Sequence, residues 1–217
     1  MIASLARRDL ATRRASWAGH LASALHRAGV GPNAVSVAGG GFGLAALAAF
    51  TCASRVAPTC RVIFLLTAAA AIQLRLLCNL LDGVLAVEKG LKTPTGELFN
   101  EIPDRLADVA ILVGAGYFQS GIPGSAALGW AAAATALFTA YVRVLGGALG
   151  LTQDFVGPMA KQHRMFVLTL VALLSAGQIA CGRRPAALPI GLAIITAGGV
   201  VTAWRRVTRL AAELEAA

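Results

Sequence analysis

The sequence predicts an all-α integral membrane protein with six transmembrane helices, preceded by an N-terminal amphipathic helix at the membrane interface. Composition is the first reason: 57% of the 217 residues are apolar and only 13% are charged, too few charges for the surface of a soluble domain. The second is a series of apolar runs of about 20 residues, the length that crosses a bilayer. The third is that Lys and Arg gather at the ends of those runs. The length argues for one membrane domain, residues 31–217, after a juxtamembrane segment, residues 1–30.

The first 30 residues are too polar to span a membrane and lack the layout of a signal peptide. In a helix, Leu10, Trp17, Leu21 and Leu25 share one face, which predicts a helix lying in the interface. Arg14 falls on the same face and would have to extend its charged end toward water.

Six apolar runs follow the helix break at Gly31-Pro32-Asn33. Two cover residues 34–53 and 62–81, and the last two cover residues 165–181 and 186–204. Between them, no charge intervenes from Asp108 to Arg143, a stretch too long for one helix. The turn signal Gly121-Ile122-Pro123-Gly124 divides this stretch into the third and fourth spans.

The net charge of +9 fits membrane topology better than nucleic-acid binding, because no solvated basic face is available to carry it. With both termini in the cytoplasm, 13 of the 19 Lys and Arg residues lie on the cytoplasmic side. These are Arg7, Arg8, Arg13, Arg14, Arg27, Lys89, Lys92, Arg105, Lys161, Arg164, Arg205, Arg206 and Arg209. The outer turns hold Arg55, Arg61, Arg183 and Arg184. Because cytoplasmic loops are enriched in Lys and Arg, we expect a multi-pass protein of the inner membrane with cytoplasmic termini.

The four cysteines, Cys52, Cys60, Cys78 and Cys181, show no metal-binding spacing. Cys52 and Cys60 flank a predicted outer turn and would either pair in an oxidising compartment or remain two free thiols.

Polar side chains gather where the second span ends and the third begins. Asn79 and Asp82 are three residues apart and share a helix face, while Asn100, Asp104 and Asp108 follow at spacings of four. Ionisable groups at membrane depth usually face a cavity. Two converging carboxylates need a cation there, and a hard divalent ion such as Mg²⁺ or Mn²⁺ suits oxygen ligands.

This stretch resembles the signature of the CDP-alcohol phosphotransferase family, D-x-x-D-G-x-x-A-R, eight residues, then G-x-x-x-D-x-x-x-D. The corresponding positions are Asn79, Asp82, Gly83, Ala86, Val87, Gly96, Asn100 and Asp104. Five of the eight match: Asp82, Gly83, Ala86, Gly96 and Asp104.

Three further stretches support the resemblance. The run Gly31-Pro-Asn-Ala-Val-Ser36 is similar to the entry of the family's first span. Asp104-Arg-Leu-Ala-Asp108 and Tyr141-Val-Arg143 are similar to stretches of its phosphatidylinositol-phosphate synthase branch. Six spans with the signature at the cytoplasmic end of the second is the family architecture.

The resemblance implies a metal site and a base. Asp82 and Asp104, with Asn79 and Asn100 in the other two acidic places, would hold one or two divalent ions, Mg²⁺ or Mn²⁺. Asp104, the last acidic position, would be the general base that activates an acceptor hydroxyl. The hydroxyl would attack the donor phosphorus next to the lipid and expel CMP.

The resemblance also implies binding residues. The CDP site would be lined by Asp82, Gly83, Ala86 and Gly96. The acceptor or a phosphate would be bound by Arg143, Lys161, Arg164, Arg105 and Asp108. For Arg143 the alternative is an arginine at a span end that extends toward water.

Asn79 and Asn100 replace acidic metal ligands, and Val87 replaces an arginine. An amide oxygen still coordinates a hard cation but brings no charge. Either Glu97 or Glu101 supplies a missing carboxylate, or the site holds one metal and the asparagines bind substrate.

We therefore expect a membrane enzyme of phospholipid synthesis, a CDP-alcohol phosphatidyltransferase that moves a phosphatidyl group from a CDP-lipid such as CDP-diacylglycerol to a small hydroxyl acceptor. The alternative is a silent family member that binds lipid or nucleotide without turnover. A small transporter is disfavoured because the polar residues gather at one membrane face. The family's homodimer is expected here, with an active site at the cytoplasmic side and no nucleic-acid partner.

Overall fold

In the computed structural model, which describes residues 16–88, 90–91, 93–118, 120–151 and 157–216, every element of regular structure is a helix. The seven helices are α1 (Ser16–Arg27), α2 (Pro32–Ala53), α3 (Pro58–Glu88), α4 (Gly96–Tyr117), α5 (Ser125–Ala148), α6 (Lys161–Ala180) and α7 (Ala187–Glu215). Five of them, α2, α3, α5, α6 and α7, are long and apolar enough to cross a membrane. An all-helical, multi-pass membrane fold is confirmed.

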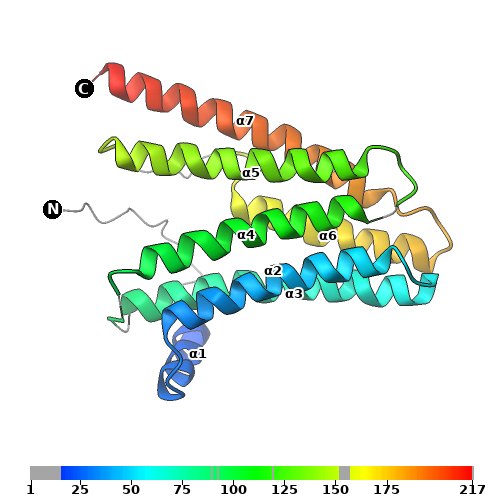
Figure 1. Ribbon diagram of the computed structural model, residues 1–217, viewed down its shortest axis with the longest axis horizontal. Coiled ribbons are helices and arrows are strands. Elements are labelled where there is room, and N and C mark those ends of the chain that lie inside the picture. The colour runs from blue at the N-terminus through cyan, green and yellow to red at the C-terminus, as the bar shows by residue number, and fades with distance from the viewer. Residues whose placement is uncertain (1–15, 89, 92, 119, 152–156, 217) are drawn as a thin grey trace.

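The six long helices form a closed ring. Neighbours in contact run α2, α3, α6, α7, α5 and α4, and α4 then returns to α2. Figure 1 shows these helices side by side along the long axis, with α1 turned away from them near the start of α2. The start of α4, the end of α5 and the end of α7 lie at the same end of the bundle (Figure 1). Side chains that point into the ring at that end can therefore contact one another even though their helices are distant in sequence.

The predicted turn at Gly121-Ile122-Pro123-Gly124 separates α4 from α5 as expected. Gly121 and Gly124 have φ of +73° and +82°, a left-handed conformation that glycine adopts without a steric penalty. Gly31 precedes α2, and Pro32 occupies its first turn, where a missing N–H costs nothing.

Helices α3, α4 and α7 extend furthest beyond their predicted apolar runs, and α7 continues to Glu215. Helix α3 continues to Glu88, and α4 begins at Gly96 and contains Pro103. Hydropathy places the span ends at the charged residues, but in the folded chain several of these charges turn inward and pair with one another. The charged turns of α4 keep it outside the group of five apolar helices.

Helix α1 packs on α3 through Ala18 and Ala22, which are fully buried, while Trp17 and Leu21 remain exposed. Leu10 and Arg14, which belong to the predicted amphipathic face, lie outside the described residues. All four cysteines are free thiols, so Cys52 and Cys60 do not form a disulfide here.

Glycines set the closest helix contacts. A Cβ atom added at Gly116 of α4 would lie 2.7 Å from Cα of Gly129 in α5, and one added at Gly43 of α2 would lie 2.5 Å from Cβ of Ala107 in α4. Small residues let membrane helices approach this closely. The two contacts hold α4 against both of its ring neighbours.

Gly116→Ala should therefore destabilise the bundle. The added methyl group has no room, and overpacking of this kind costs about 1–3 kcal/mol. Thermal unfolding in detergent measures the effect. Gly41→Ala is the matched control, because a Cβ at Gly41 meets nothing within 4 Å and alanine is the better helix former. Equal melting temperatures for the two variants would contradict the packing argument.

Candidate active site

The site is built around the carboxylate of Asp104, which α4 points toward α3 and α6. Its Oδ1 accepts a hydrogen bond from Asn79 Nδ2 at 2.8 Å and lies 3.3 Å from Arg75 Nη2. Its Oδ2 forms an ion pair with the Lys161 ammonium. Lys161 Nζ also donates to Asn79 Oδ1 at 2.9 Å. Three helices thus meet at one carboxylate, and the Asn79 amide is held at both ends.

Asp82 lies one helical turn after Asn79 and is 6% exposed. Its Oδ2 accepts a hydrogen bond from the hydroxyl of Ser36 in α2 at 2.7 Å. Within the described part of the chain, no Lys, Arg or His forms an ion pair with Asp82. A buried carboxylate without a cation is costly, so this position favours a positively charged ligand.

Next to Asp104, the side chains of Arg75, Asp108 and Arg164 form a buried ionic cluster. Asp108 is 1% exposed; its Oδ1 is 2.5 Å from Arg75 Nη2, and its Oδ2 is 3.2 Å from Arg164 Nη2. Arg164 also donates to the carbonyl of Met159 at 2.9 Å. Arg75 connects the cluster to the site, because the same Nη2 donates to the backbone carbonyl of Asp104 at 3.0 Å.

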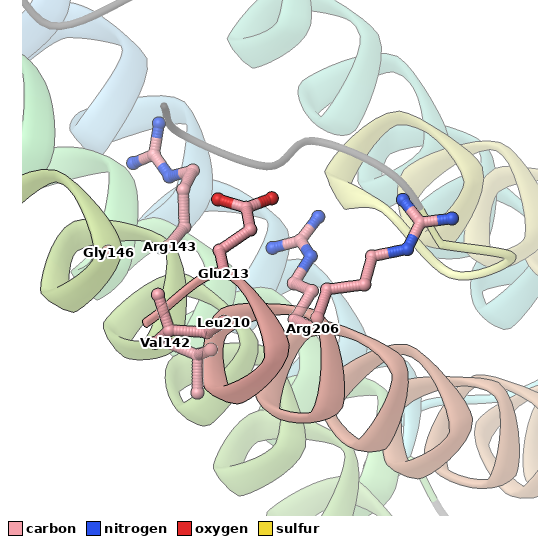
Figure 2. A pocket seen from close by; sticks show the side chains of 7 residues that line it. Val142, Arg143, Gly146, Arg206, Leu210 and Glu213 are labelled. Atoms are coloured by element: carbon pink, nitrogen blue, oxygen red, sulfur yellow. The ribbon is translucent and has the colours of Figure 1, made fainter. Parts of the chain in front are cut away.

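A second set of charges lies toward α5. Glu101 accepts a hydrogen bond from Arg143 at 2.7 Å and forms an ion pair with Arg105 at 3.1 Å. Arg143 also lines a small pocket between α5 and α7, together with Val142, Gly146, Arg206, Arg209, Leu210 and Glu213. Figure 2 shows the side chains of Arg143, Glu213 and Arg206 pointing to the same side of this pocket. Three arginines and one glutamate line the pocket, so its lining carries an excess of positive charge.

The other predicted site residues differ in how far they are buried. Gly83 and Ala86 are buried on α3 after Asp82, and Gly96 begins α4. Asn100 is half-buried, whereas Glu97 is exposed. The structure joins Asn79 to Asp104 by a hydrogen bond and places Asp82 one helical turn after Asn79 on α3.

Three residues at or near the site had no predicted role. Ser36 belongs to the stretch that resembles the family's first span, so its position was a usable signal. Arg75 shares a face with Asn79 and Asp82, and a charge within an apolar run was the signal for it. Arg206 is buried and donates to the Thr139 carbonyl at 2.8 Å, and only its place at the end of an apolar run marked it.

The donor set fits one hard divalent cation. Among the described residues, no group of three or more His, Cys, Asp or Glu side chains converges on one point. Mg²⁺ is commonly held by one or two carboxylates together with substrate phosphates. Asp82 has a hydroxyl partner and forms no ion pair with any residue that the structure describes, so it is the carboxylate that can anchor such an ion.

Solved structures with this architecture include phosphatidylinositol phosphate synthases of Mycobacterium tuberculosis. The synthase with CDP-DAG bound has a TM-score of 0.75 and 22% identity, over 90% of this chain and 94% of that chain. The chain has the fold of these synthases. The complex with manganese and citrate gives a TM-score of 0.74 and 22% identity over 89% of this chain and 88% of that one. For the apo form the values are 0.70 and 22%, over 87% and 93%.

The likeness to these synthases lies in the structure. No family model matches the sequence. No curated protein matches it either.

Proposed function

We propose that this protein is a CDP-alcohol phosphatidyltransferase that moves a phosphatidyl group from a CDP-lipid, such as CDP-diacylglycerol, to a small hydroxyl acceptor. The observation that carries the proposal is the hydrogen bond between Asn79 and Asp104, with Asp82 one helical turn after Asn79 on α3. They stand in the register of the family signature, on the fold of a synthase that has been solved with CDP-DAG bound.

The chemistry assigned to the chain is proton removal at Asp104. Its carboxylate takes the proton of the acceptor hydroxyl, whose oxygen then forms a bond to the phosphorus next to the lipid. The bond from that phosphorus to the CMP oxygen breaks, and CMP leaves with the electron pair. Gly83, Ala86 and Gly96 carry no large side chain, and Gly83 and Ala86 would lie against the cytidine.

One divalent ion, Mg²⁺ or Mn²⁺, is proposed at Asp82, and when bound it would offset the charge of the donor diphosphate and make CMP a better leaving group. The related synthase forms a complex with manganese. Asn100 is half-buried and would offer a neutral amide oxygen to an ion, while the exposed position of Glu97 gives no support to its alternative role as a ligand.

Ser36→Ala should weaken Mn²⁺ binding. The Ser36 hydroxyl orients Asp82 through a 2.7 Å hydrogen bond, and loss of such a supporting contact typically lowers metal affinity about 10- to 100-fold. Titration of the purified protein with Mn²⁺ measures the change. Ser23→Ala is the matched control, because the Ser23 hydroxyl bonds only to the carbonyl of Gly19 in α1. Unchanged affinity in Ser36→Ala would argue against an ion at Asp82.

For the acceptor we propose a small polyol phosphate. The pocket of Arg143, Arg206 and Arg209 has the charge to hold a phosphate group, and Lys161 lies beside the proposed base. Arg164 and Asp108 are buried together, which supports a role in holding the site rather than in contacting the acceptor. Arg105 pairs with Glu101 and lies at its edge.

Six spans are proposed, with α4 as the additional one, because α4 occupies a full place in the ring between α2 and α5. The charge distribution supports an inner-membrane protein whose termini and active site face the cytoplasm. Exposed Trp17 and Leu21 support an interfacial α1. A homodimer is also proposed; Trp130 and Phe138 give α5 an exposed apolar face suited to a second copy or to lipid.

Release of CMP from CDP-diacylglycerol tests the proposed activity. Purified wild-type protein in lipid, given Mn²⁺ and a series of polyol phosphates, should release CMP only when an acceptor is present. No release above a protein-free blank, with any acceptor, would instead favour a silent protein that binds lipid or nucleotide.

A further inference from the structure

We propose that the Lys161 ammonium takes the place of a second metal ion, so that this chain works with one divalent ion and one fixed lysine. The inference rests on the proposed function, because it concerns how the same site neutralises a donor diphosphate. Lys161 bridges two positions of the signature. Lys161 Nζ contacts both Asn79 Oδ1 and Asp104 Oδ2, as a cation shared between two ligands would.

The geometry explains why residue 79 is an asparagine. Its Nδ2 lies 2.8 Å from Asp104 Oδ1, which is a good hydrogen bond for an amide. An aspartate at the same place would bring a second carboxylate to that distance, and the single charge of Lys161 would then face two carboxylates. Asn79 removes one of the two negative charges, and its remaining oxygen accepts the hydrogen bond from Lys161. The neutral amide of Asn79 and the positive charge of Lys161 therefore complement each other beside Asp104.

Charge balance leads to the same conclusion. A signature with four acidic residues holds four negative charges, enough for two divalent ions. Here Asn79 and Asn100 leave two, on Asp82 and Asp104. Lys161 pairs with Asp104, whereas Asp82 lacks an ion pair within the described residues. One divalent ion at Asp82 then gives the site a net positive charge that attracts a diphosphate.

Lys161 is placed to serve the ligand as well as the protein. Its side chain is 20% exposed, compared with 1% for Arg75, so the ammonium can also reach a bound phosphate oxygen. Arg75 is directed toward Asp108 and the Asp104 backbone and cannot take this role. Lysine rather than arginine suits the position because an ammonium is a compact point charge.

Counting bound Mn²⁺ in the full-length protein tests the inference. Electron paramagnetic resonance measures the free ion, and CDP-diacylglycerol is present throughout. Wild-type protein should bind one Mn²⁺ per chain. The triple variant Asn79→Asp/Asn100→Asp/Lys161→Met should bind two, since it restores the acidic positions and removes the ammonium.

The matched control is Asn79→Asp/Asn100→Asp/Arg205→Met. It has the same net charge as the first triple variant but keeps Lys161 and loses Arg205, an exposed residue of α7. It should still bind one ion, because Lys161 occupies the second place.

The inference would be overturned if wild-type protein bound two ions or none. It would also be overturned if the first triple variant bound one ion or the control bound two. If the first variant does not fold, as judged by gel filtration, the wild-type and control counts still decide. The proposed function fails separately: the expected ion counts together with no CMP release in the acceptor screen would refute turnover and leave the role of Lys161 standing.

Discussion

Asp104→Asn should lower the rate of CMP release from CDP-diacylglycerol by about 10²- to 10⁴-fold, the usual contribution of a positioned general base. The substitution keeps the size of the side chain and an oxygen that can accept from Arg75 or Lys161. It removes the ability to take a proton from the acceptor hydroxyl. Initial rates at saturating donor and acceptor measure the loss in the chemical step rather than in binding.

Two controls separate this effect from a general change of the protein. Glu215→Gln makes the same carboxylate-to-amide change at the exposed end of α7 and should leave the rate unchanged. Thermal unfolding of Asp104→Asn shows whether the site remains folded. A folded Asp104→Asn protein that releases CMP at the wild-type rate would remove Asp104 from the reaction. The base would then have to be sought elsewhere.

Sequence reasoning located the helices well but not their ends. Apolar runs predicted the centres of α2, α3, α5, α6 and α7, because a span must be apolar toward lipid. The same reasoning ended the second run at residue 81 and began the third at Asp108. Hydropathy does not predict that the side chains of Arg75 and Asp108 form an ion pair inside the ring. Charges that pair internally do not end a helix, and pairing depends on which helices become neighbours.

At the site, too, residues close in sequence were predictable, whereas contacts between residues distant in sequence were not. The signature spacing alone placed Asn79, Asp82 and Asp104 on two consecutive helices, and the structure brings them together. The contact between Lys161 and Asp104 joins positions 57 residues apart and depends on α6 lying beside α3. No spacing rule links those residues, so lysine could only be assigned to a phosphate in general terms. The close contact of Gly116 with Gly129 was unpredictable for the same reason.

Asp108→Leu should cause the largest loss of stability in the chain, about 3–5 kcal/mol, because it leaves buried cations without their shared anion. Arg164 would keep only its contacts to Thr139 and the Met159 carbonyl. Arg75 would keep its weaker pair with Asp104. Thermal unfolding in detergent, with gel filtration to detect aggregated protein, measures the loss.

Pairing the substitution with Arg164→Met tests whether charge is the cause. Asp108→Leu/Arg164→Met removes one of the two cations that share Asp108 and leaves Arg75, so it should regain part of the stability that Asp108→Leu loses. Glu101→Leu is the matched control for loss of a carboxylate on α4. Its side chain is 30% exposed, and such a pair contributes about 0–1 kcal/mol. A double variant no more stable than Asp108→Leu would show that shape at this position, and not the uncompensated guanidinium, determines the loss. Because Arg75 joins the cluster to Asp104, recovery of stability without recovery of CMP release would show that the cluster also positions the proposed base.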